Sequence, residues 1–363
     1  MNLKVMMDGE EVGRLRYDSD TAFFAYSDHW LREGFPISPR SLPLEDRLFS
    51  GRSDRFEGLF GVFADSLPGG WGMLTAVKAL GRRGISYFSL DPLEKLSYVG
   101  ADGLGALYYG PSERSFREPG EPDLDRLCDE CMSLSVESSG DLDEIFMRAG
   151  STGGARPKIN LRIDGEDWIV KFRERSDPIS AGRMEYEYTQ TAKECGIEVP
   201  ETRLLDSSTS DGYFASRRFD RQGGRRVHML SLGGLLEVPG DMPLLDYLTF
   251  LQATRYVTGS QEETVKAFRL SCFNILAKNF DDHSKNFAYL YSRDKGRYVL
   301  SPAYDLTGTP SMAEHFMTCM GNPLPGEKEL FGLADASGIP RNRAEDIIRT
   351  VADNVSERLA EWL

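Results

Sequence analysis

The chain has 363 residues, 40% of them hydrophobic and 28% charged, a composition typical of a globular protein with two or three domains. Its formal charge of −14 argues against a surface built to neutralise a nucleic-acid backbone, although the arginines within residues 217–226 leave room for a local basic patch. No segment is long and apolar enough for a transmembrane helix and the N-terminus lacks an apolar signal core, so we expect a cytoplasmic protein without membrane contacts.

The first 110 residues predict a β-rich domain. Residues 3–17 alternate apolar and polar side chains around Asp8-Gly9, the pattern of a β-hairpin. A Gly-rich loop at 65–72 is expected to precede a helix. The remaining elements predicted here are a strand at 22–26, a helix at 73–80 and short strands within 104–109.

Residues 111–150 predict a linker followed by helices. Residues 111–122 are polar and proline-rich without a periodic pattern, and helical stretches follow at 124–134 and 142–147. The chain's cysteines are odd in number and unpatterned, which favours reduced thiols. Cys128 and Cys131 have CxxC spacing, but without a second pair or a nearby histidine they are expected to be two positions on one helix rather than a zinc site.

The rest of the chain predicts a strand-rich region at 151–240 and a helical region at 241–363, the outline of a bilobal α+β fold. The strand-rich region also contains a helix that should end at Gly196, a residue suited to the position after a helix. In chain order the predicted elements are strands 159–163 and 168–172, helix 185–194, strands 202–205 and 213–216, and helices 245–256 and 262–277.

The most informative segment is Asn279–Asn286 with the following Leu300–Leu306. It supplies Asp281, then Asn286, then Asp305, the order in which a protein kinase presents its catalytic base and its magnesium ligands. The residues between them alternate around Arg293–Gly296 and predict a β-hairpin, which would return Asp305 to the side of Asp281. Three oxygen-bearing side chains would then meet where Mg²⁺ and a triphosphate can bind.

Each residue of this segment can be given a role. Asp281 is the candidate general base and Lys285 the candidate stabiliser of charge on a transferring phosphoryl group. Asn286 and Asp305 would hold Mg²⁺, and His283 is expected mainly to hold the loop beside the nucleotide. Two alternatives stay open, because an Asp-Asp-His cluster also suits a metal-dependent hydrolase and acidic loops are often only solvated turns.

Upstream residues predict the nucleotide contacts. Lys171 lies within an apolar strand, where an amine needs an anionic partner, and Glu185 on the next helix is the natural one. The alternative is an edge-strand lysine that points to solvent. The loop before the first strand would cover the phosphates with backbone N–H groups, although by itself this signal is weak. Its candidate contacts are Ser151, Thr152, Gly153, Gly154, Ala155 and Lys158.

The segment Arg218-Phe-Asp-Arg221 follows a strand where a kinase would have the hinge between its lobes. Backbone groups around Arg217 and Phe219 could then contact adenine, and Asp220 could contact the ribose. Phe219 is equally compatible with a place in the core.

These motifs together resemble the HipA family, the bacterial serine/threonine kinase toxins of type II toxin–antitoxin modules. The matching segments run in family order across almost the whole chain: 65–72, 151–158, 169–171, Glu185, 196–200, 218–221, 279–286 and 301–306. The resemblance implies an N-terminal β-rich subdomain joined to a kinase core. It also implies that Lys171 contacts ATP phosphates, that Asp281 is the base, and that Asn286 and Asp305 bind Mg²⁺.

The resemblance implies regulation and partners as well. Ser151 aligns with the serine that family members autophosphorylate, and the added charge would repel ATP and switch the enzyme off; Thr152 is a neighbouring acceptor. A HipB-like helix-turn-helix antitoxin would be the partner, with DNA bound only through it, and known family targets include aminoacyl-tRNA synthetases. Gly69 and Arg156 depart from residues common in the family, at positions outside the catalytic core.

Two further hypotheses remain beside a toxin kinase. One is a catalytically silent protein of the same kind that serves as an antitoxin-binding or regulatory scaffold. The other is a small-molecule kinase, because the core also resembles lipid and antibiotic kinases.

Overall fold

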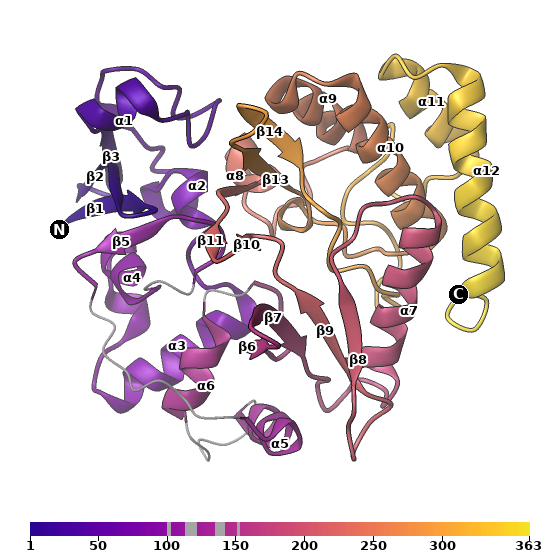
Figure 1. Ribbon diagram of the computed structural model, residues 1–363, viewed down its shortest axis with the longest axis horizontal. Helices are drawn as coiled ribbons and strands as arrows, with labels where there is room; N and C mark the ends of the chain where they lie inside the picture. Colours follow the sequence, from indigo (N-terminus) through magenta and orange to yellow (C-terminus); the bar gives the residue numbers. More distant parts are fainter. Residues whose placement is uncertain (100–102, 113–121, 135–141, 151–152) are drawn as a thin grey trace. The chain divides into compact units, whose positions relative to one another are not determined.

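The structure is a computed structural model that describes residues 1–99, 103–112, 122–134, 142–150 and 153–363. The chain divides into two compact units, each considered by itself. The first comprises Met1–Gly182 and Arg203–Leu230, and the second comprises Arg183–Thr202 and Ser231–Leu363. Both combine antiparallel strands with helices, which confirms the predicted α+β class (Figure 1).

The first unit opens with a five-stranded sheet in the order β4-β3-β2-β1-β5. The predicted hairpin is present, with Leu3 opposite Leu15 and both side chains buried on one face. β5 covers only the last part of the strands predicted within 104–109. The elements are β1 (Asn2–Met7), β2 (Glu10–Asp18), β3 (Thr21–Tyr26), α1 (Asp28–Glu33), β4 (Phe49–Ser50), α2 (Gly61–Ala64), α3 (Gly70–Arg82), α4 (Pro92–Val99) and β5 (Tyr108–Gly110).

A second sheet in the same unit has the order β6-β7-β9-β8 and carries the helices of the middle region on its apolar face. Cys128 and Cys131 are buried in this core together with Trp71 and Trp168, so the CxxC pair is a packing feature as predicted. The elements are α5 (Leu124–Leu134), α6 (Leu142–Ala149), β6 (Lys158–Ile163), β7 (Glu166–Lys171), β8 (Thr202–Leu205), β9 (Tyr213–Arg217), β10 (Arg221–Gln222), β11 (Arg225–Arg226) and β12 (Met229–Ser231). The predicted linker lies largely outside the described residues.

The second unit is mostly helical around the predicted hairpin β13–β14, against which α9 and α10 pack (Figure 1). Local signals set the helix ends: Asp246 accepts a hydrogen bond from the N–H of Leu248 at the start of α9, and Gly259 ends it with a φ of 63°. The elements are α7 (Ala181–Glu194), α8 (Leu232–Leu236), α9 (Tyr247–Thr258), α10 (Gln261–Leu276), β13 (Ala288–Ser292), β14 (Arg297–Leu300), α11 (Glu327–Ala336) and α12 (Arg341–Arg358).

No helix in the part of the chain that the structure describes combines the length and the apolar character that a membrane span needs. The predicted site residues are divided between the two units. Lys158 and Lys171 lie in the first, while Glu185 and the segment 279–305 lie in the second.

Candidate functional site

The segment Asn279–Asn286 is an irregular loop fixed by hydrogen bonds along its length. The side chain of Asn279 donates to Asn274 Oδ1 at 3.1 Å and to the carbonyl of Asp305 at 3.4 Å. The N–H of Phe280 donates to Thr309 Oγ1 at 2.8 Å. Because Asp305 and Thr309 are 26 and 29 positions away from the residues they accept from, the fold of the second unit determines the loop's conformation.

Two adjacent aspartates in this loop have opposite environments. The side chain of Asp281 is 51% exposed, and its nearest recorded ion-pair partner is His283, with Nε2 3.8 Å from Oδ1. Asp282 is buried and its carboxylate accepts hydrogen bonds from the Tyr247 hydroxyl at 2.6 Å and the Met317 N–H at 3.1 Å. His315 Nδ1 lies 2.7 Å from the same carboxylate. Asp281 can therefore meet a substrate, while Asp282 anchors the loop.

Asn286 and Asp305 come into the neighbourhood of Asp281 through backbone contacts. Asn286 Nδ2 donates to the carbonyl of Asp281 at 2.7 Å, while Asn279 contacts the carbonyl of Asp305 as described above. Asp305 has a φ of 54°, in the left-handed region that few residues other than glycine adopt. Such backbone conformations cluster at functional sites because the surrounding structure must enforce them.

The donor set around these residues suits a magnesium ion. The amide nitrogen of Asn286 is used by the loop itself, so its Oδ1 is oriented as a possible ligand, and carboxylates of Asp281 and Asp305 are hard oxygen donors as well. Mg²⁺ usually takes only one or two protein oxygens beside phosphate and water. Among the described residues there is no group of three or more His, Cys, Asp or Glu side chains that could hold a metal alone.

Lys285 and His283 are placed by the same loop. His283 Nδ1 accepts a hydrogen bond from the N–H of Lys285 at 3.2 Å, which caps the short turn Ser284–Asn286 and matches the loop-holding role predicted for this ring. The hydroxyl of Tyr304 donates to the carbonyl of Lys285 at 2.6 Å. The stem of Lys285 lies against Gly240, where a β-carbon would approach its Cγ to 3.0 Å.

In the first unit, hydrogen bonds of Lys158 and Arg156 hold the described part of the predicted phosphate loop in place. Lys158 is buried and its ammonium donates to the carbonyl of Gly153 at 2.6 Å. Arg156 makes two contacts to the carboxylate of Asp177, at 3.1 and 3.3 Å. Ser151 and Thr152, the predicted phosphorylation site and its neighbour, lie outside the described residues. Gly154 and Ala155 are exposed, as residues that contact a ligand should be.

The strand register places two predicted phosphate contacts next to each other. Lys158 in β6 is paired directly with Lys171 in β7. Directly opposed residues of an antiparallel pair share one face of the sheet, and opposed like charges are unfavourable. The Lys171 ammonium lies 5.6 Å from the centre of the Phe214 ring. A polyanion over this face would be attracted by both lysines.

The glycine-rich start of α3 contacts the phosphate loop, which gives a testable prediction. The N–H of Trp71 donates to the carbonyl of Gly154 at 2.8 Å, and a β-carbon on Gly70 would lie 2.2 Å from that carbonyl oxygen. Gly70 also has a φ of 46°. We expect Gly70→Ala to displace the loop, to destabilise the first unit by about 1–3 kcal/mol and to weaken nucleotide binding. Gly81→Ala, where a β-carbon meets nothing within 4 Å, is the matched control for calorimetry and denaturation.

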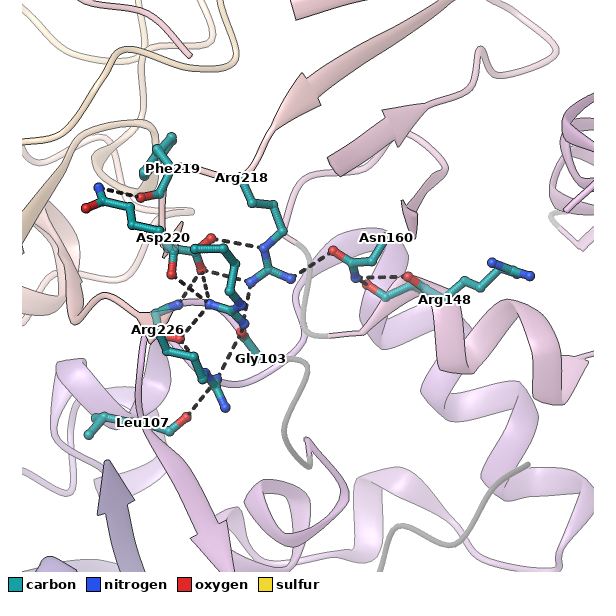
Figure 2. Close-up of polar contacts among 12 residues, drawn as sticks. Gly103, Leu107, Arg148, Asn160, Arg218, Phe219, Asp220 and Arg226 are labelled. Carbon is teal, nitrogen blue, oxygen red and sulfur yellow. Dashed lines mark hydrogen bonds and ion pairs between the residues drawn. The ribbon is translucent and has the colours of Figure 1, made fainter. Parts of the chain in front are cut away.

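Within residues 218–226, the buried Arg218 and the part-buried Arg221 and Arg226 form an arginine cluster (Figure 2). Arg218 holds both carboxylate oxygens of Asp220, from Nε at 2.9 Å and from Nη2 at 2.8 Å, and reaches Asn160 Oδ1 at 3.0 Å. Arg221 and Arg226 donate to the carbonyl of Gly105 at 3.0 and 3.1 Å. These side chains tie the segment before β5 to the sheet that contains β6. Of the arginines that the sequence left open as a surface basic patch, these three are held in the cluster, while Arg225 is exposed.

This geometry bears on the predicted hinge contacts. Asp220 is buried, and its Oδ2 also accepts hydrogen bonds from Arg221 and from the N–H of Gly105. Its carboxylate is therefore engaged within the cluster, and a contact with a ribose would have to break ion pairs. Arg217 pairs instead with Glu166 at 2.8 Å, at the end of β9. Phe219 is half-buried and its carbonyl accepts from Gln222, so it is not a core residue. The adenine contacts of Arg217 and Phe219 stay predictions.

The cluster predicts how stability depends on pH. Burial alone would raise the pKa of Asp220, but the charges and hydrogen bonds of Arg218 and the charge of Arg221 lower it to about 2. A carboxyl whose pKa is lower in the folded than in the unfolded chain stabilises the fold at pH values above its unfolded pKa. This stabilisation is lost as the pH falls through the folded pKa. We therefore expect about 2 kcal/mol to be lost between about pH 4 and pH 2.

Urea-unfolding midpoints followed across that pH range measure the effect. Asp220→Asn should lower the midpoint at neutral pH and flatten the acid limb, whereas the exposed Asp294→Asn should leave the limb unchanged. An unchanged acid limb in the Asp220 variant would contradict the assigned role.

Sequence reasoning missed the residues that position the site. Asp282, Tyr247 and His315 anchor the loop from separate segments, and only the adjacency of Asp282 to Asp281 hinted at it. The Gly70 contact with the phosphate loop was also missed, although the Gly-rich segment itself was noted. The predicted pair between Lys171 in β7 and Glu185 in α7 stays a prediction, because the two residues belong to different units.

Two family models match the chain. One, described as HipA-like C-terminal domain, covers residues 150–359, and the other, described as HipA N-terminal domain, covers residues 3–110. A protein of Sinorhizobium fredii (strain NBRC 101917 / NGR234) named "Putative kinase Y4mE" is 28% identical over 344 residues, which are 85% of this chain and 77% of that protein.

One solved structure shows the same fold. A chain in the Shewanella oneidensis MR-1 toxin–antitoxin complex of HipA, HipB and operator DNA aligns with 99% of this chain and 90% of its own length, with a TM-score of 0.75 and 19% identity. The proinflammatory kinase CtkA of Helicobacter pylori aligns with 56% of this chain and 90% of its own length, with a TM-score of 0.39 and 15% identity.

Proposed function

This chain belongs to the HipA family, and we propose that it is a kinase that uses ATP and Mg²⁺ to phosphorylate a serine or threonine hydroxyl of a protein. The similarity to a protein named as a kinase supports the general activity. The finer assignments rest on the arrangement of the described side chains and on the family resemblance.

The observation that carries the proposal is the contrast within Asn279–Asn286. The hydrogen bonds of Asn279, Phe280 and Asp282 fix the loop, yet the Asp281 carboxylate is half exposed. Asn286 donates a 2.7 Å hydrogen bond to the backbone carbonyl of Asp281. A loop held this firmly around one accessible carboxylate suits a base that must meet a hydroxyl in a fixed geometry.

In the proposed mechanism, Asp281 accepts the proton of the attacking hydroxyl. Lys158 and Lys171, from paired positions of β6 and β7, bind the phosphates of ATP, and Lys285 stabilises charge on the transferring phosphoryl group. Asn286 and Asp305 would hold Mg²⁺, which neutralises charge on the phosphates when bound. Asp282 keeps the base in place without touching the substrate.

The family resemblance supplies the biological part of the proposal. The kinase would act as a growth-inhibiting toxin in the bacterial cytoplasm, with an aminoacyl-tRNA synthetase as one precedent for its target. A HipB-like antitoxin would neutralise it and would contact DNA on its behalf, as the HipA–HipB–DNA composition of the Shewanella complex suggests. Autophosphorylation of Ser151 would be the off-switch.

Transfer of labelled phosphate from ATP to the purified chain and to proteins of a bacterial lysate tests the proposal. We expect magnesium-dependent labelling of serine or threonine, found by phosphopeptide mass spectrometry, and its loss in Lys171→Met. A chain that binds the antitoxin but transfers no phosphate would favour the regulatory scaffold. Labelled metabolites without any labelled protein other than the chain itself would favour a small-molecule kinase.

A further inference from the structure

A cavity of about 370 Å³ lies in the second unit, behind the segment that leads to Asp305. Its walls come from the turn after α7, from α10 and from the end of β14 with the residues that follow. This volume is in the lower part of the range found for small-molecule pockets. None of the roles assigned above uses the cavity.

The walls combine apolar side chains with one under-used cation. Ile197, Leu270, Leu300 and Ala303 supply the apolar lining, and all four are buried. Arg269 has five N–H donors and uses one of them, from Nη1 to the carbonyl of Cys195 at 2.9 Å. Among the residues that the structure describes, its other donors have no acceptor.

The other cation that lines the cavity, Lys266, is shared by two carboxylates. The Lys266 ammonium lies 3.2 Å from Glu263 and 3.4 Å from Glu198. The side chains of Lys266 and Glu198 are 47% and 62% exposed. Glu263 is buried and also accepts the N–H of Leu300 at 2.8 Å. The donors of the part-buried Arg269 that have no acceptor among the described residues are therefore the cationic groups of the cavity left for a ligand.

We propose that this cavity binds a small monocarboxylate with a short branched apolar chain. The guanidinium of Arg269 would receive the carboxylate in a two-point contact, the geometry for which arginine is suited, and the apolar walls would enclose the chain. A doubly charged phosphate fits less well, because Lys266 is engaged by two carboxylates and only one further cation lines the cavity.

The position of the cavity couples it to the proposed metal site. Ala303 is part of the wall, its N–H donates to the carbonyl of Glu198 at 2.8 Å, and the chain continues from it to Asp305. An occupant that contacts Ala303 would therefore restrict the segment that carries Asp305. This coupling rests on the proposed function, whereas binding itself does not.

Isothermal calorimetry with isobutyrate, in the absence of ATP, tests the site on the full chain. We expect saturable binding, and binding of the neutral isostere isobutyramide weakened at least about tenfold, since it cannot offer a charged acceptor. Arg269→Gln should weaken isobutyrate to a similar extent. Arg255→Gln, an exposed arginine on the neighbouring helix α9, should leave binding unchanged.

Ala303→Leu gives an independent check, because its larger side chain would fill the cavity while Arg269 stays in place. We expect this variant also to lose isobutyrate binding. The proposal is overturned if the wild-type chain shows no saturable binding, if isobutyramide binds equally well, or if both variants bind isobutyrate as the wild type does. Hydrogen exchange of residues 301–305 that slows with isobutyrate would support the coupling even in a chain without kinase activity.

Discussion

Asp281→Asn should reduce phosphoryl transfer by about 10²–10⁴-fold while leaving the fold intact. A positioned general base contributes a factor of this size, and asparagine has the same shape but cannot accept the proton. The side chain is 51% exposed and, within the described part of the chain, its ion-pair neighbour is His283 at 3.8 Å. The free energy of unfolding should therefore change by no more than about 0.5 kcal/mol.

The measurement is the initial rate of phosphate transfer from labelled ATP, with urea denaturation of the same preparations. Asp294→Asn in the exposed turn between β13 and β14 is the control and should change neither quantity. Affinity for ATP should stay within a few-fold of the wild type, because Asp281 is assigned to the hydroxyl. A variant that keeps its full rate would remove Asp281 from the mechanism.

Local patterns were enough to predict most of the fold. The hairpins of 3–17 and 287–300 depend on alternation and a turn within one short segment, and both are present. Gly196 ends its helix with a φ of 76°, as its lack of a side chain allows. The helix predicted from Met73 begins earlier, at Gly70, because the chain there is held by a hydrogen bond to the distant Gly154.

The site residues could be predicted from the sequence only where they lie within one short segment. Asp281, Asn286 and Asp305 were identified from their spacing, which a kinase-like loop and hairpin fix. Asp220 was predicted to lie near a ribose because residues 218–221 follow a strand where a kinase would have its hinge, and the ion pairs of Asp220 with Arg218 and Arg221 were not foreseen. Their side chains instead meet carbonyl groups of Gly103 and Gly105, more than one hundred positions earlier, and no periodicity reports such contacts.

The same limit explains why the residue next to the proposed base could not be assigned from sequence. In the sequence Asp281 and Asp282 are equivalent acids, and either could serve as a base. The fold separates them: the buried one meets donors from α9 and from residues 315–317, and the other faces solvent. Burial and long-range partners, rather than residue type, decide which acid is reactive.

Asp282→Asn should therefore fail in a different way from Asp281→Asn. Its carboxylate is buried and accepts from Tyr247 at 2.6 Å and from Met317 at 3.1 Å, with His315 Nδ1 at 2.7 Å. An amide can accept on one side only, so at least one buried donor would lose its acceptor. We expect a destabilisation of about 1–3 kcal/mol and a loss of transfer activity of at least about tenfold, because the loop that carries Asp281 loses its anchor.

Hydrogen exchange followed by mass spectrometry separates this anchoring role from a catalytic one. Peptides that cover residues 279–286 should exchange faster in Asp282→Asn and at the wild-type rate in Asp281→Asn. Tyr247→Phe, which removes one of the donors to Asp282, should give an intermediate loss of activity. If Asp282→Asn lost activity with unchanged exchange and stability, while Asp281→Asn stayed active, the two acids would have to exchange roles, since only a residue that acts on the substrate can stop the reaction without loosening the loop.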